Sequence, residues 1–199
     1  MTLTMSHRLL GTCAILLCAL ISTQARAVGP VLVQVRSGML LGSLSAGETT
    51  GSISTLPYLD VECNIMTSSQ NGYSLRAVLA PDLEELDLNY AYAGVGQRYY
   101  LGGPGVFISR TEEGASVSVR PGINYFVGWD FGMSHSILSR VGSLAAASTA
   151  FDFGLTAGAN WYVSDGVAIQ FGASTSYALG FTTLAASGIV IKSFIGISF

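Results

Sequence analysis

The first candidates for chemistry in this sequence are the acidic residues Asp60 and Glu62. They are two residues apart, which puts both carboxylates on one face if the segment is a strand. Paired carboxylates could serve acid/base catalysis or hold a cation. Arginines such as Arg36 and Arg76 fall on the equivalent face of neighbouring segments, which favours ion pairing over either role. These residues can meet only if strands bring their segments together.

The second candidate is His135, which has a serine on each side of it in the sequence. A hydrolytic site needs a serine or an acid within reach of the imidazole. Alternation along a strand groups His135 with Met133 and Ile137 and turns Ser134 and Ser136 to the other face. We therefore predict no catalytic, cofactor-binding or metal-binding residues. A lipid-modifying barrel enzyme that uses His135 remains an alternative.

Strands that could position these residues are visible in the periodicity of the chain. In residues 117–127 and 151–162, odd-numbered positions are mainly apolar, and even-numbered positions are mainly small or polar. A period of two predicts a strand with one apolar and one polar face. Both segments are long enough to cross a bilayer as tilted strands.

A short repeat organises much of the chain. Each copy ends in an aromatic or apolar pair followed by a small turn, as expected of a meander of hairpins. The copies occupy residues 61–66 (the weakest), 96–101, 122–127 and 158–163. The predicted turns occupy residues 68–72, 102–104, 128–130 and 164–166.

Four such turns, with both chain ends on one side, predict ten strands. The count falls to eight if the fourth and fifth segments belong to something less regular, and ten is the favoured number. The expected strands are 31–42, 55–66, 73–80, 87–101, 105–110, 115–127, 131–140, 149–163, 167–178 and 189–199.

Composition restricts the environment of these strands. Only 11% of the 199 residues are charged, against about 25% in typical soluble domains, and 50% are hydrophobic. No run of about 20 apolar residues follows residue 30, which argues against a helical membrane protein. The net charge of -3 and the scattered basic residues argue against nucleic-acid binding. We therefore predict an all-β fold, a closed antiparallel transmembrane β-barrel.

The first residues are predicted to be a targeting signal for export. His7 and Arg8 precede an apolar run from Leu9 to Ile21, which is too short for a permanent membrane anchor. Ala25-Arg26-Ala27 then fits the small-x-small pattern of signal-peptide cleavage. We expect residues 1–27 to be a signal peptide, cleaved near Ala27, and residues 28–199 to form the barrel.

The polar faces of the strands predict a charged barrel interior. Two interpretations remain open: the charges pair and the lumen is filled with side chains, or they line a narrow water path. The aromatic residues Tyr99, Tyr125 and Trp161 precede the predicted turns and are expected to form a girdle at one membrane interface. The predicted interior polar network comprises Arg36, Asp60, Glu62, Arg76, Arg98, Arg120, Asp152 and Lys192.

The last segment places isoleucines at 189, 191, 195 and 197 on one face and ends on Phe199. This pattern resembles the C-terminal signal by which bacterial outer-membrane barrels are recognised for assembly. Together with the leader and the repeat, it makes the chain similar to small outer-membrane β-barrels of the OmpA/OmpX/OmpW kind.

The resemblance implies a bacterial outer-membrane location, contact with outer-membrane lipids including lipopolysaccharide, and recognition of Phe199 by the assembly machinery. The function that we expect is non-enzymatic: membrane integrity, or limited passage of small solutes. A lipid-modifying barrel enzyme and a soluble secreted β-barrel are the alternatives.

Overall fold

The computed structural model describes most of the chain after residue 30. The described ranges are 31–46, 49–68, 70–81, 88–101, 106–111, 114–119, 122–140, 143–164, 167–181 and 186–199. The predicted signal peptide and its cleavage site near Ala27 lie outside the described residues. Among the described residues, no helix is long and apolar enough to cross a membrane.

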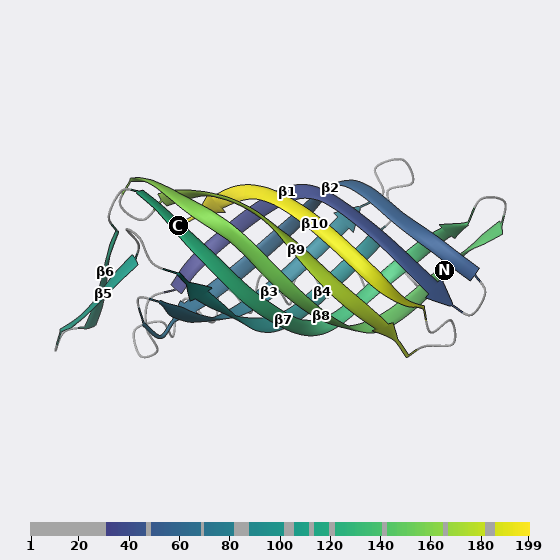
Figure 1. Cartoon of the computed structure of the whole chain (residues 1–199), viewed down its shortest axis with the longest axis horizontal. Coiled ribbons are helices and arrows are strands. Elements are labelled where there is room, and N and C mark those ends of the chain that lie inside the picture. The colour runs from purple at the N-terminus through teal and green to yellow at the C-terminus, as the bar shows by residue number, and fades with distance from the viewer. Residues whose placement is uncertain are drawn as a thin grey trace, which may run out of the picture.

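Eight strands form a closed antiparallel barrel in the order β1-β10-β9-β8-β7-β4-β3-β2 (Figure 1). The predicted closed antiparallel barrel is thereby confirmed, with the smaller of the two strand counts that the sequence left open. The barrel strands are β1 (Val31–Ala46), β2 (Thr49–Met66), β3 (Asn71–Pro81), β4 (Leu88–Tyr100), β7 (Gly122–Arg140), β8 (Ser143–Ser164), β9 (Val167–Gly180) and β10 (Ser187–Ser198).

Closure joins the first strand to the last. β1 pairs with β10 from Gln34 opposite Ser198 to Ser45 opposite Ser187. The backbones of Val33 and Phe199 exchange two hydrogen bonds, at 2.7 and 2.9 Å. We call the end of the barrel where β1 begins and β10 finishes the terminal end, and the opposite end the distal end.

The remaining two strands lie outside the barrel. β5 (Val106–Thr111) and β6 (Gly114–Val119) pair only with each other and connect β4 to β7 at the terminal end (Figure 1). The favoured count of ten barrel strands is therefore not observed. The expected strand 115–127 is divided between β6 and β7, because the chain leaves the hairpin and enters the barrel within that segment.

The predicted turn at residues 128–130 is wrong, because β7 runs without interruption from Gly122 to Arg140. Gly128 and Asp130 resemble a turn in sequence, but they lie on the inward face of this strand. A Cβ atom at Gly128 would collide with the Arg98 side chain, so this glycine makes room for a neighbouring side chain.

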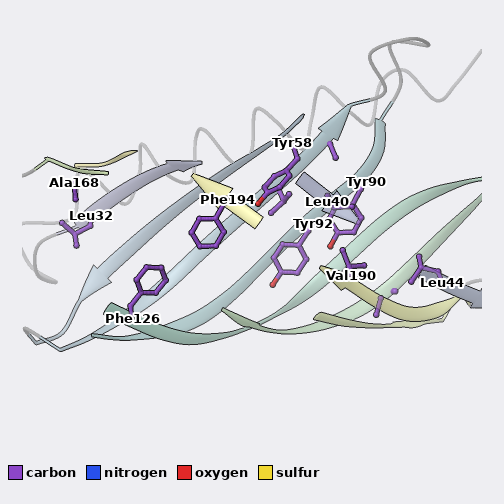
Figure 2. Close-up of a cluster of buried hydrophobic side chains, with 14 of the residues drawn as sticks. Leu32, Leu40, Leu44, Tyr58, Tyr90, Tyr92, Phe126, Ala168, Val190 and Phe194 are labelled. Atoms are coloured by element: carbon purple, nitrogen blue, oxygen red, sulfur yellow. The ribbon is translucent and has the colours of Figure 1, made fainter. Parts of the chain in front are cut away.

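Side chains alternate between the lumen and the outside along every barrel strand whose side chains are described. The outward face is strongly apolar: Phe153 is 53% exposed, Leu155 56% and Ile195 62%. The inward face carries the polar and charged side chains, and aromatic and aliphatic residues also lie inside (Figure 2). The charged side chains that could form a functional site therefore lie in the lumen.

Candidate functional site

Six charged side chains form a closed ring across the middle of the lumen. Three arginines and three acids alternate, and each group contacts two groups of opposite charge. The circuit runs Arg36, Asp60, Arg76, Asp130, Arg98, Glu62 and back to Arg36. We call this set the ion-pair ring. Its formal charges sum to zero.

The contacts in the ring are short. Arg76 reaches Asp60 at 2.8 Å and Asp130 at 3.1 Å. Arg98 reaches Glu62 and Asp130, each at 2.8 Å. Arg36 is 3.0 Å from Asp60 and also contacts Glu62. Buried charges are costly unless they are paired and hydrogen-bonded, and this geometry pairs each of them twice.

Neutral groups hold the ring in place. The Thr156 hydroxyl donates to Asp130 at 3.0 Å, and the Arg36 guanidinium stacks over the Phe194 ring at 4.8 Å. Arg36 also donates to the amide oxygens of Gln34 and Gln170, each at 3.4 Å. These contacts fix the planes of the guanidinium groups and so the directions of their donors.

Strand alternation and register explain why the ring forms. Asp60 and Glu62 point inward from β2, and the register sets Asp60 opposite Arg36 of β1 and Glu62 opposite Arg76 of β3. β4 supplies Arg98 and β7 supplies Asp130. The ring therefore draws on five adjacent strands of the barrel.

Apolar and aromatic side chains occupy the lumen on both sides of the ring. Leu32 and Phe126 lie toward the terminal end, and Leu40, Val190 and Leu44 lie toward the distal end (Figure 2). Leu40 and Val190 are fully buried. The described inward side chains are buried on both sides of the ring, which favours the first of the two interpretations left open by the sequence, a lumen filled with side chains.

The sequence-predicted interior residues have different positions relative to the ring. Arg36, Asp60, Glu62, Arg76 and Arg98 come together in it. Asp152 and Lys192 are also buried in the lumen but lie outside the ring. The eighth residue, Arg120, is outside the described residues.

Lys192 and Asp152 lie on the distal side of the ring, next to two tyrosines. The Lys192 ammonium is 5.4 Å from the centre of the Tyr90 ring and 5.2 Å from that of the Tyr92 ring. Asp152 accepts a hydrogen bond from the Tyr90 hydroxyl at 3.1 Å. These contacts are cation–π contacts and a hydrogen bond from a hydroxyl to a carboxylate, whereas the contacts of the ring are ion pairs.

Sequence reasoning missed Asp130, because it was assigned to a turn. The signal was present in the alternation of β7. Its inward face carries Asn124, Phe126, Gly128 and Asp130, and the apolar residues Trp129 and Phe131 lie on the opposite face. Extending the period of two beyond residue 127 would have placed Asp130 on the same face as Asn124.

The remaining predicted residues lie on the outside at the terminal end. Tyr99, Tyr125 and Trp161 are 37%, 58% and 51% exposed. Phe199 is also exposed beyond the end of β10.

The candidate base of an enzyme, His135, contacts the Thr149 hydroxyl at 3.1 Å. Its two neighbours in the sequence, Ser134 and Ser136, are buried in the lumen.

No protein-family model and no characterised protein matches the sequence. Among solved structures, Neisserial surface protein A (NspA) is similar over 84% of this chain and 95% of its own, with a TM-score of 0.51 and 10% identity. The chain has the fold of the small outer-membrane β-barrels.

Two further barrels match at lower TM-scores. The N-terminal barrel domain of Pseudomonas aeruginosa OprF has 12% identity and a TM-score of 0.47, covering 84% of this chain and 97% of its own. Ail of Yersinia pestis has 11% identity and a TM-score of 0.40, covering 84% and 98%. The closed eight-stranded barrel and its similarity to NspA confirm the architecture that the resemblance implied.

Proposed function

We propose that this chain is an integral protein of the bacterial outer membrane whose barrel is sealed, and that it serves membrane integrity rather than solute passage. The observation that carries this proposal is the closed ion-pair ring, with buried apolar and aromatic side chains on both sides of it. An ion crossing the lumen would have to break ion pairs of the ring and also pass these apolar side chains.

The outward face supports a location in a lipid bilayer. Large apolar side chains cover the barrel between its ends, and a soluble protein rarely exposes a continuous surface of this kind. In this proposal Tyr99, Tyr125 and Trp161 form a girdle at the interface on the terminal side. Outer-membrane lipids, including lipopolysaccharide, surround the barrel.

The chain reaches its membrane in the same proposal through two terminal signals. Residues 1–27 direct export and are removed near Ala27. Phe199 and the outward isoleucines of β10 are then read by the outer-membrane assembly machinery. Substitution of Phe199 by Ser should slow assembly in cells, with little effect on refolding of the purified chain into detergent.

The decisive experiment is to refold residues 28–199 into planar bilayers and record current at both polarities. We expect no steady conductance from a preparation whose folding is verified by the gel mobility shift between folded and heat-unfolded barrel. Steady single-channel steps from the same preparation would contradict the sealed barrel and would favour limited solute passage instead. A protein found in the soluble fraction of cells would contradict the membrane location.

A further inference from the structure

Three polar residues lie on the outward face of the barrel toward its distal end, on the adjacent strands β4, β7 and β8. His135 of β7 is directly opposite Thr149 of β8, and its Nδ1 atom is 3.1 Å from the Thr149 hydroxyl oxygen. On the other side of β7, the register sets Ala91 of β4 opposite His135, and Asn89 is the next outward residue of β4. All three polar residues are partly exposed. We call His135, Thr149 and Asn89 the distal polar patch.

The distal polar patch borders an outward face that is otherwise apolar. The outward residues of β7 from 127 to 133 and of β8 from 151 to 159 are all aliphatic or aromatic. One step of alternation from the patch, the Phe151 ring lies 4.6 Å from that of Phe181 and 6.2 Å from that of Phe131, measured between ring centres. The outward face therefore changes from aromatic to polar at the patch, as expected where a barrel leaves the hydrocarbon core of a membrane.

The number of residues along each strand gives the depth of the patch. His135 lies ten residues after Tyr125 on β7, and Asn89 lies ten residues before Tyr99 on β4. A tilted strand needs about 9–11 residues to cross the hydrocarbon core. This step rests on the proposed function, in which Tyr99 and Tyr125 mark the interface on the terminal side. The patch then lies at the interface on the distal side, at the level of the lipid headgroups.

The chemistry of the patch suits an anionic oxygen. When Nδ1 of His135 accepts from the Thr149 hydroxyl, the ring proton is on Nε2, which then donates, and a protonated imidazole donates from both nitrogens. The Asn89 amide supplies two further N–H donors. Among the described residues, no outward position of β4, β7 or β8 carries an acid that would repel an anion. The anionic oxygens that every phospholipid and lipopolysaccharide brings to this depth are those of phosphate.

We propose that the distal polar patch is a binding site for the phosphate group of a membrane lipid. The His135 Nε2 atom and the Asn89 amide donate to the phosphate, and the Thr149 hydroxyl orients the imidazole. Hydrogen bonds to an ionised acceptor are about twice as strong as neutral ones, and the apolar surroundings of the patch strengthen them further. The site holds one lipid beside β4, β7 and β8, with its acyl chains along Phe131 and Phe151.

A single histidine makes the test specific. Residues 28–199 contain the whole barrel and only one histidine, so ¹⁵N-labelled histidine reports on His135 alone. The chain is refolded into phosphatidylglycerol vesicles, and dephasing of the imidazole ¹⁵N signals by lipid ³¹P is measured by solid-state NMR on frozen samples. We expect strong dephasing of Nε2. A folded, unaltered barrel without dephasing of either nitrogen would overturn the proposal, whether or not the variants below fold.

Relocated histidines separate binding from depth. Tyr125→His combined with His135→Gln puts the label at the terminal interface, away from Thr149 and Asn89, and should give much weaker dephasing. Equal dephasing at the two interfaces would show that depth alone brings the phosphate close, and it would contradict a binding site. In the unmoved His135, Thr149→Val should also weaken the dephasing, and no change would contradict the role of the hydroxyl.

A deeper histidine tests the membrane position separately. Phe131→His combined with His135→Gln should show contacts with acyl-chain protons and no dephasing by ³¹P. If these contacts are present while His135 shows no dephasing, the phosphate site is refuted and the membrane location stands. If the contacts are absent, the proposed membrane location itself is refuted.

The composition of the vesicles identifies the source of the phosphate. Galactolipid vesicles contain no phosphorus, and with inorganic phosphate in the buffer we expect no dephasing of His135. Dephasing under these conditions would assign the patch to free phosphate and overturn the proposal. Adding phosphatidylglycerol or lipopolysaccharide to the galactolipid should restore the dephasing, and the lipid that restores more of it is the preferred ligand.

Discussion

Each charged residue of the ion-pair ring touches two residues of opposite charge, so none of them is redundant. Arg98→Ala leaves Glu62 and Asp130 with one arginine each in a buried environment. Removal of one partner from a buried ion pair typically costs about 3–5 kcal/mol. We expect a loss of this size in the free energy of unfolding, measured by urea titration in lipid vesicles with tryptophan fluorescence.

The control for this loss is Thr175→Ala, an exposed position on the outward face of β9. We expect a change of less than about 0.5 kcal/mol there, as for most surface substitutions. Equal stabilities for Arg98→Ala and Thr175→Ala would show that the ring does not stabilise the barrel.

Inward glycines give a second prediction at the level of single residues. A Cβ atom at Gly128 would collide with the Gln97 carbonyl oxygen and the Arg98 side chain, whereas one at Gly154 would lie 3.2 Å from the Ser176 Cβ. Gly128→Ala should therefore destabilise the barrel by about 1–3 kcal/mol, the usual effect of overpacking. Gly154→Ala should cost less in the same urea titration, and the reverse order would contradict this account of Gly128.

Part of the site was predictable residue by residue. Strand alternation was enough to put Arg36, Asp60 and Glu62 on one face, because a period of two needs no knowledge of the partner strands. The ring itself was not predictable, because it depends on the register between strands and on which strands are neighbours. Asp130 could have been placed on the inward face, but its pairing with two arginines could not have been predicted.

At the scale of elements, the hairpin of β5 and β6 is separate from the barrel. Its strands pair only with each other, and β4 pairs directly with β7. Deletion of residues 106–119 leaves a seven-residue connection between these neighbours, residues 101–105 and 120–121. We expect the shortened chain to fold with an unchanged gel mobility shift and a similar urea midpoint. Failure to fold would show that the hairpin is needed to form the barrel.

The alternation of apolar and polar residues could not separate this hairpin from the barrel strands. Residues 117–119 alternate in the same way as the segment that follows them, and both hairpin strands have ordinary strand propensities. Only length distinguishes them: β5 and β6 have six residues each, fewer than a tilted strand needs to cross a bilayer. A strict length criterion would have favoured eight barrel strands.

At the scale of the whole molecule, the outward face decides whether the barrel spans a membrane. Leu155 lies next to Thr156, a ring contact, and so near the middle of the barrel, whereas Val163 lies near the terminal end. In a bilayer an outward arginine costs about 2–4 kcal/mol at the midplane and about 0–1 kcal/mol near an interface. We therefore expect Leu155→Arg to destabilise the barrel much more than Val163→Arg.

The measurement is the unfolding free energy of both variants in lipid vesicles. In a soluble barrel both positions would face water, and the two substitutions would have similar, small effects. Equal effects would therefore contradict a transmembrane position for the barrel.

The composition of the ring has a consequence for the order in which the barrel can be built. β1 to β4 contribute three arginines and two acids, so the first half of the chain carries an excess positive charge on its inward face. Asp130 balances that charge, but it lies in β7, which follows the β5–β6 hairpin in the chain. A half-inserted sheet of β1 to β4 would expose an unbalanced row of charges to acyl chains. The lowest barrier is therefore to keep this face hydrated until β7 has docked, which favours insertion of the strands as one nearly complete sheet over entry hairpin by hairpin.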